Sequence, residues 1–145
     1  MFLTLGDRFS RKEDAQKLDN HHGKIVRINK YELVPADNPL VGKANAPPEI
    51  WSYGHRNAQG ATLSPDGNVR THAHGLQGGD EINVLRAGAN YGWLEITYGE
   101  NYGGDKIGEG LRRKAGMETP LHHWVPAIAP SGMAFLTSER YGKSW

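Results

Sequence analysis

The sequence predicts an all-β fold made of short strands joined by tight turns. Glycine accounts for 19 of the 145 residues, and this abundance disfavours a helical bundle but suits the turns between strands. Short apolar and β-branched runs, each bounded by glycine, proline, asparagine or aspartate, recur along the chain. The length is that of one domain, and a hydrophobic content of 37 % is enough to form a core.

The expected strands follow the apolar runs in chain order. After the first run, Gly6 and Asp7 are expected to form a turn. The residues Ser64-Pro65-Asp66-Gly67 favour a tight turn, because proline and glycine supply the backbone angles that such turns need, so the runs on either side predict a hairpin. The expected strands span residues 2–5, 23–30, 49–53, 60–63, 68–71, 82–86 and 132–137.

The connections between these strands are of two kinds. Residues 10–20 predict a short surface helix or a solvated loop, with Ser10 as the N-cap and Glu13 completing a capping box. Residues 31–48, which are rich in proline, and residues 99–119, which are rich in glycine and charge, predict long irregular loops. Loops of this length are usually functional or disordered.

Composition excludes several classes of function. The formal net charge is +1, with basic and acidic residues nearly balanced, so we expect no nucleic-acid partner. The apolar runs are too short to span a membrane. The absence of cysteine excludes disulfides and thiolate metal sites. The start of the chain does not resemble a signal peptide, and both ends look cut rather than finished.

Two polar, glycine-punctuated stretches are candidates for the functional site. They are residues 51–60 and residues 71–93, and we expect them to form loops that build one site. Arg56 in the first stretch is compatible with carboxylate binding, because its guanidinium donates two parallel charge-assisted bonds, and equally with a simple ion pair to a nearby acidic residue. Asp80 and Glu81 are compatible with metal binding or with a solvated acidic pair.

Histidines leave a zinc site open as a further alternative. His72 and His74 lie two residues apart on an expected strand, so both face one side, and His122 or His123 would supply a third ligand. Satisfied surface histidines are the plainer interpretation of the His122-His123 pair. No serine-based catalytic triad and no dinucleotide-binding loop is recognisable.

Several longer sequence segments resemble those of one protein family. The chain is similar, in order and over essentially its whole length, to the soluble pyrroloquinoline-quinone (PQQ)-dependent sugar dehydrogenases, that is, the glucose/sorbosone dehydrogenases and in particular their aldose sugar dehydrogenase branch. The matching segments are Leu5-Gly6-Asp7-Arg8, His22-Gly23-Lys24-Ile25-Val26-Arg27-Ile28, Trp51-Ser52-Tyr53-Gly54-His55-Arg56-Asn57-Ala58-Gln59-Gly60, His74-Gly75-Leu76-Gln77-Gly78-Gly79-Asp80-Glu81-Ile82-Asn83, Asn90-Tyr91-Gly92-Trp93 and Ile128-Ala129-Pro130-Ser131-Gly132-Met133.

This resemblance implies a six-bladed β-propeller of which residues 1–145 are an internal segment of roughly two to three blades, without the N- and C-terminal blades. Weak repeats, such as residues 24–28 against 81–85, fit recurring blades, although short apolar runs also match by chance. The resemblance places the catalytic histidine before Met1 and further cofactor-binding cations after Trp145, so no catalytic residue is expected in this chain.

The resemblance also implies roles for individual residues. It assigns PQQ binding to Arg56, Asn57, Gln59 and His74, and the catalytic Ca²⁺ to the backbone carbonyls of Gly75 and Leu76. It assigns a second, structural Ca²⁺ to the Glu81 carboxylate and the Tyr91 carbonyl, and a sugar-facing rim to Trp124 and Tyr102. Two departures stand out, because Leu76 replaces the usual proline and Ala73 replaces a commonly acidic residue.

The function implied for the complete enzyme is oxidation of an aldose at its anomeric carbon to a lactone, by hydride transfer to PQQ. The alternative is a catalytically inactive, truncated propeller that acts as a binding or interaction module. The resemblance further implies an aldose as partner, a periplasmic or secreted location and a homodimer for the complete enzyme.

Overall fold

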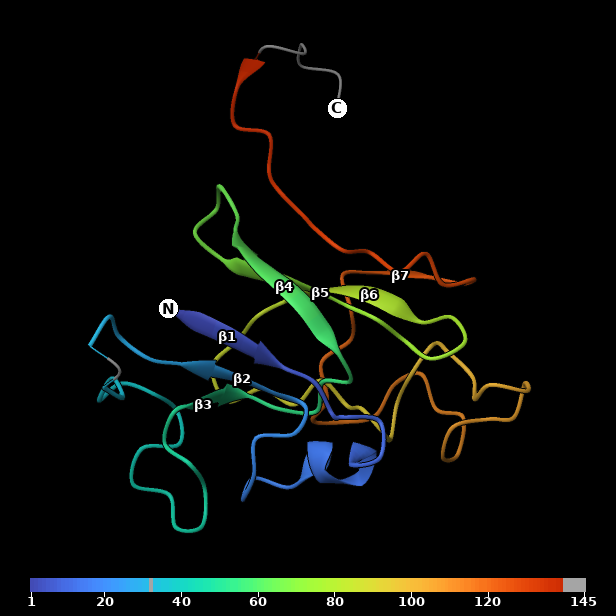
Figure 1. The fold of residues 1–145 in the computed structure, drawn as a ribbon, viewed down its shortest axis with the longest axis horizontal. Helices are drawn as coiled ribbons and strands as arrows, with labels where there is room; N and C mark the ends of the chain where they lie inside the picture. The colour runs from blue at the N-terminus through green and yellow to red at the C-terminus, as the bar shows by residue number, and fades with distance from the viewer. Residues whose placement is uncertain (32, 140–145) are drawn as a thin grey trace.

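The computed structural model describes residues 1–31 and 33–139 and shows an all-β chain with two antiparallel sheets. The first sheet has the order β1-β2-β3 and the second the order β4-β5-β6-β7, and β1 packs against β4 where the two sheets meet (Figure 1). The strands are β1 (Phe2–Leu5), β2 (Lys24–Arg27), β3 (Ile50–Ser52), β4 (Ala58–Leu63), β5 (Val69–Ala73), β6 (Asp80–Val84) and β7 (His122–Trp124).

The predicted hairpin is confirmed. Strands β4 and β5 pair antiparallel, with Leu63 opposite Val69, and the turn closes through a bond of 2.8 Å from the Ser64 N–H to the Asn68 carbonyl. The register shifts between Ala58 and Gly60, so Gln59 forms a bulge at the start of β4. This hairpin continues into β6 and β7 as a four-stranded meander, the strand arrangement of a propeller blade.

Two predicted elements differ from the structure. Within residues 10–20 only the single-turn 3₁₀ helix η1 (Lys12–Gln16) forms, and the Ser10 hydroxyl bonds to the Arg8 carbonyl instead of capping it. Residues 132–137 are not a strand, although Met133 and Phe135 are half-buried in strand-like alternation, because no strand of the described part of the chain pairs with them. No helix among the described residues is long and apolar enough to cross a membrane.

Three small apolar clusters form the core. The largest lies between the two sheets and brings Ile25 of β2 against Ala58 and Ala73 of the hairpin, with Leu85 and Tyr91. The other two clusters are Ala15, Leu76, Trp93 and Ile107, and Val26, Leu40 and Ile50. Apolar burial therefore holds the long loops onto the sheets as well as the sheets onto each other.

A buried lysine joins η1 to β2. The Lys24 side chain has no exposure, and its ammonium donates to the carbonyls of Asp14 and Ala15, each at 3.0 Å, and of His22 at 2.6 Å. Burial lowers the pKa of Lys24 to about 8, and the charges of Asp14 and Asp19 oppose that shift. One side chain thus donates to two carbonyls of the single-turn helix and to a third in the loop before β2.

Replacing Lys24 is therefore expected to destabilise the fold. Lys24→Met keeps the aliphatic stem but leaves the His22 carbonyl without its donor and takes one donor each from the carbonyls of Asp14 and Ala15, so we expect the free energy of unfolding to fall by about 2 kcal/mol. Urea denaturation followed by circular dichroism measures this loss. Lys43→Met, at an exposed position, is the matched control and should change stability by less than about 0.5 kcal/mol.

Candidate functional site

The two candidate stretches meet at one end of the β4–β5 hairpin. Arg56 and Asn57 precede β4, whereas His74 and Gly75 follow β5, and antiparallel pairing places these positions side by side. The His74 N–H donates to the Asn57 carbonyl at 3.0 Å, and the Arg56 guanidinium donates from Nη1 to the His74 carbonyl at 3.0 Å. The expectation that the two stretches build one site is consistent with this geometry.

Arg56 and Gly75 share a small buried cavity. Its volume is about 20 Å³, which suits one water molecule or one ion and not an organic ligand. The residues that line it are Arg56, His74, Gly75, Gly79, Glu81, Tyr91, Trp93, Ile96 and Thr97.

Glu81 contributes an unusual carboxyl group to this cavity. Burial raises the pKa of this carboxyl group to about 7. A hydrogen bond of 2.8 Å from the Asn83 side-chain amide has the opposite, smaller effect on the pKa. The interpretation of Asp80 and Glu81 as a solvated acidic pair is wrong for Asp80, which is only 1 % exposed, whereas Glu81 is half-buried.

Asp80 fixes the loop that carries Gly75. Its Oδ1 accepts the Gly75 N–H at 2.8 Å, and its Oδ2 accepts the N–H groups of Ile128 and Ala129 at 2.7 and 2.6 Å. The chain is so close at this point that a Cβ on Gly75 would lie 2.0 Å from the Gly78 carbonyl oxygen. Only glycine fits there, so the conformation of the loop is tightly determined.

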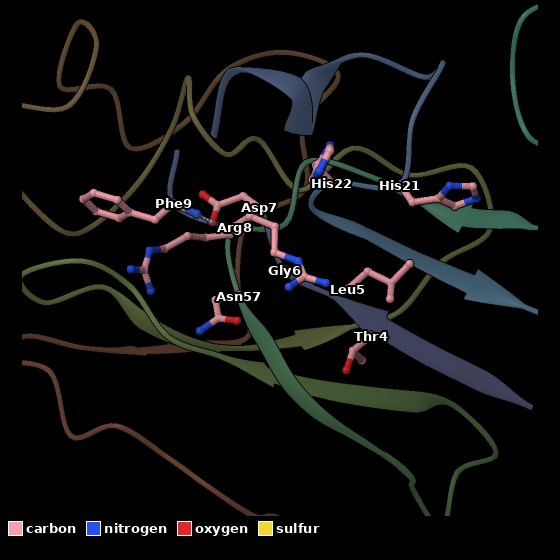
Figure 2. Close-up of a pocket in the computed structure, with 10 residues that line it drawn as sticks. Thr4, Leu5, Gly6, Asp7, Arg8, Phe9, His21, His22 and Asn57 are labelled. Carbon is pink, nitrogen blue, oxygen red and sulfur yellow. Dashed lines mark hydrogen bonds between the residues drawn. The ribbon is translucent and has the colours of Figure 1, made fainter. Parts of the chain in front are cut away.

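A second, larger cavity also has Arg56 in its lining. It has a volume of about 520 Å³, within the range of ligand-sized pockets, and Figure 2 shows His21 and His22 near one end of it and Arg8, Phe9 and Asn57 toward the other. The lining residues are Thr4, Leu5, Gly6, Asp7, Arg8, Phe9, His21, His22, Arg56 and Asn57.

Asp7 holds the loop that forms one wall of the larger cavity. Its carboxylate accepts the Phe9 N–H at 2.9 Å and the Trp93 indole N–H at 2.8 Å, and its own N–H donates to the Arg56 carbonyl at 2.8 Å. Asp7 is 4 % exposed. The backbone of Arg56 is thereby fixed from one side and its guanidinium from the other.

Arg56 itself is incompletely satisfied. Its Nε is buried and has no hydrogen-bond partner, and across residues 1–31 and 33–139 no carboxylate forms an ion pair with it. Within the described residues, Arg56 therefore does not form the simple ion pair that the sequence left open. Since a buried guanidinium N–H without a partner is costly, its place in the lining of two cavities favours a role in ligand binding.

The residues that line the larger cavity are suitable for binding the carboxylate groups of a planar anionic cofactor. The larger cavity has the volume for such a ligand, and Arg56 offers an unused donor beside the Asn57 amide. The small cavity offers oxygen atoms of the half-buried Glu81 carboxyl group and of the nearby backbone, which are the kind of ligand that Ca²⁺ takes, and Arg56 also lines it.

Of the remaining candidates, Gln59, Leu76, Tyr102 and Trp124 lie outside these two cavities, whereas Tyr91 lines the small one. Gln59 is exposed at the bulge, and Tyr102 is 66 % exposed within residues 99–119. Trp124 is half-buried in β7, where its ring meets His122 edge-on at 4.5 Å. The Leu76 side chain belongs to the core, and the Tyr91 ring stacks on His55 at 4.4 Å, which leaves only their backbone groups for a metal.

The zinc alternative finds no support in the geometry. His72 is buried, the His74 ring bonds to the Pro130 carbonyl at 3.0 Å, and His122 and His123 are exposed on β7. No group of three histidine, cysteine or acidic side chains in the described part of the chain is placed to hold a metal ion.

Sequence reasoning missed Asp7, Arg8 and Asp80 as parts of the site. The sequence predicts only a turn at Asp7, and it predicts for Asp80 only metal binding or membership of a solvated acidic pair. The available signal was that each carboxylate follows a glycine directly before or after a strand, where backbone N–H groups need acceptors.

Comparison with known proteins agrees with the resemblance seen in the sequence. The family model described as Glucose / Sorbosone dehydrogenase matches residues 1–145. The chain is 43 % identical over 143 residues to the aldose sugar dehydrogenase YliI of Escherichia coli (strain K12), covering 97 % of this chain and 38 % of that protein.

Solved structures give the same result. A crystal structure of a glucose dehydrogenase matches with a TM-score of 0.80 and 46 % identity, covering 85 % of this chain and 36 % of the other. The PQQ-bound aldose sugar dehydrogenase of Streptomyces coelicolor matches with a TM-score of 0.65 and 26 % identity, covering 85 % and 31 %. The chain thus spans less than two fifths of these relatives, and it belongs to the glucose/sorbosone dehydrogenase family.

Proposed function

We propose that this chain is part of a quinoprotein oxidoreductase that oxidises an aldose at its anomeric carbon to a lactone by hydride transfer to PQQ. The observation that carries the proposal is the buried, unpartnered Nε of Arg56, a residue that lines two cavities, in a chain similar to a PQQ-bound sugar dehydrogenase. The six-bladed propeller implied by the resemblance is part of the same proposal, of which the β4–β7 sheet would be one blade.

The residues of this chain would bind and orient the cofactor. Arg56 and Asn57 would donate hydrogen bonds to its oxygen atoms, and His74, whose ring is fixed by the Pro130 carbonyl, would limit how the cofactor lies. The chemistry supplied by bound PQQ is acceptance of a hydride. The base that removes the sugar hydroxyl proton would be the histidine that the resemblance places before Met1.

Two calcium ions complete the proposal. The backbone carbonyls of Gly75 and Leu76 would offer oxygen ligands to a Ca²⁺ beside the cofactor, and the loop that carries them is held in place by Asp80. Glu81 and the Tyr91 carbonyl, at the small cavity, would hold a second Ca²⁺. Because the Glu81 carboxyl group is buried without a cationic partner among the described residues, a divalent ion there would stabilise its ionised form.

Replacing Arg56 is expected to weaken PQQ binding. In a chimera in which this chain replaces the matching 38 % of the Escherichia coli relative, Arg56→Gln should raise the Kd for PQQ roughly tenfold to a hundredfold, because a charge-assisted bond is lost. Fluorescence titration measures the Kd, and dye reduction with glucose in the presence of Ca²⁺ measures turnover.

Arg56→Lys is the matched control, because it keeps the charge but loses the two parallel N–H donors of the guanidinium. Its Kd for PQQ should lie between those of the native chimera and of Arg56→Gln. Circular dichroism and a thermal melt verify that each chimera folds. A folded chimera that binds PQQ without any turnover would favour the alternative, an inactive binding module. A folded chimera that binds no PQQ, together with no binding by the chain itself at high protein concentration, would contradict the proposal.

The pH dependence of stability should report on Glu81. Because burial raises the pKa of Glu81 above the ordinary value of a glutamate to about 7, the stabilisation from the neutral form is fully present below the unfolded-state pKa and is lost as the pH rises through 7. Without metal, we expect the free energy of unfolding to fall by about 3 kcal/mol or less between pH 5 and pH 8 on this account.

Glu81→Gln should remove that fall, and Ca²⁺ should restore stability at pH 8 in the native sequence but not in the variant. Urea denaturation at pH 5 and pH 8, with Ca²⁺ or with a chelator, measures both effects. Asp105→Asn, which changes an exposed carboxylate, is the control. An equal Ca²⁺ effect in the native sequence and in Glu81→Gln would show that the ion binds elsewhere.

A further inference from the structure

The larger cavity has one wall that the proposed cofactor contacts do not use. Its lining continues from Arg56 and Asn57 along the loop after β1, which contributes Gly6, Asp7 and Arg8 (Figure 2). The cavity has room for a ligand group well beyond the reach of Arg56 alone, at about 520 Å³.

Arg8 is the notable side chain in this wall. It is exposed, and no carboxylate of the described residues pairs with it. Its backbone is left-handed, with a φ of 58°, and that of Phe9 is also left-handed, at 57°. For residues other than glycine this conformation costs about 1 to 2 kcal/mol each, and the bond from the Phe9 N–H to Asp7 holds it in place.

The charges around the cavity have mainly one sign. Arg8 and Arg56 are cationic, and the carboxylate of Asp7 is already engaged by the Phe9 N–H and the Trp93 indole. At the opposite end, His21 bonds to Glu49 at 2.8 Å, and His22 lies 3.6 Å from a carboxylate oxygen of Asp14. The donors that remain at the cavity include the two guanidinium groups and the Asn57 amide, and the guanidinium groups favour a planar anion.

We propose that this cavity binds a carboxylate group between Arg8 and Arg56, so that Arg8 is a further ligand-binding residue of the site. The inference rests on the proposed function, and the carboxylate has two possible sources. One is the cofactor, which carries carboxylates of its own. The other is the substrate, which would then be an aldose that bears a carboxylate, that is, a hexuronic acid.

The test compares Arg8→Gln with the native sequence in the chimera described above. Titrations with PQQ, and separately with glucuronate and glucose, measure the Kd of each ligand by calorimetry, and dye reduction gives KM and kcat for both sugars. Arg8→Lys keeps the charge without the two parallel N–H donors. Arg113→Gln removes the same charge from an exposed position outside both cavities and is the matched control.

Each source predicts a different result. If the carboxylate belongs to the cofactor, Arg8→Gln raises the Kd for PQQ about tenfold, and any change in the Kd and KM is the same for glucuronate and for glucose. If it belongs to the substrate, the Kd for PQQ stays unchanged, whereas the Kd and KM for glucuronate rise about tenfold and those for glucose do not. Either result supports the assignment of Arg8.

The proposal is overturned if Arg8→Gln matches Arg113→Gln for PQQ and for glucuronate alike. That outcome, in a chimera whose native form binds PQQ, would leave the proposed function standing. Conversely, a folded native chimera that binds glucuronate in an Arg8-dependent manner but binds no PQQ would reject the proposed function and retain the anion site. Thermal melts of all variants exclude unfolding as the cause of a loss.

Discussion

Two buried carboxylates determine how the irregular half of this chain is arranged. Asp7 and Asp80 together accept four backbone N–H groups and one indole N–H, all in segments outside the strands. A backbone donor buried without a partner costs free energy comparable to a lost hydrogen bond, so loops of this kind need such acceptors. Each carboxylate lies at the end of a strand, and each fixes one of the loops around Arg56.

Arg56 is where the two loops become one site. Its carbonyl accepts the N–H of Asp7, and its guanidinium donates to the carbonyl of His74 in the loop that Asp80 holds. A displacement of either loop would therefore move this side chain. This side chain lines both the small cavity with Glu81 and the large cavity with Arg8.

The sequence predicts those parts of this arrangement that depend on neighbouring residues in the chain. The turn at residues 64–67 fixed the hairpin, and the hairpin brings Arg56 next to Gly75. What depends on distant partners was not readable. A strand-like pattern at residues 132–137 forms no strand without a neighbouring edge, and the burial of Asp80 results from residues nearly fifty positions away, at Ile128 and Ala129. The roles implied for Gln59 and Tyr102 came from family resemblance alone.

The bulge at Gln59 also constrains how this family member can change over evolutionary time. One extra residue there sets which face the residues before it occupy relative to the later side chains of β4, because side chains alternate along a strand. A single-codon deletion at this point would remove the bulge and change which face Ala58 and the residues before it occupy relative to the hairpin, whose own register is set by its turn. The irregular segment at residues 99–119 has no such alternation, so variation in length is tolerated there far more readily than at the strand that begins beside Arg56.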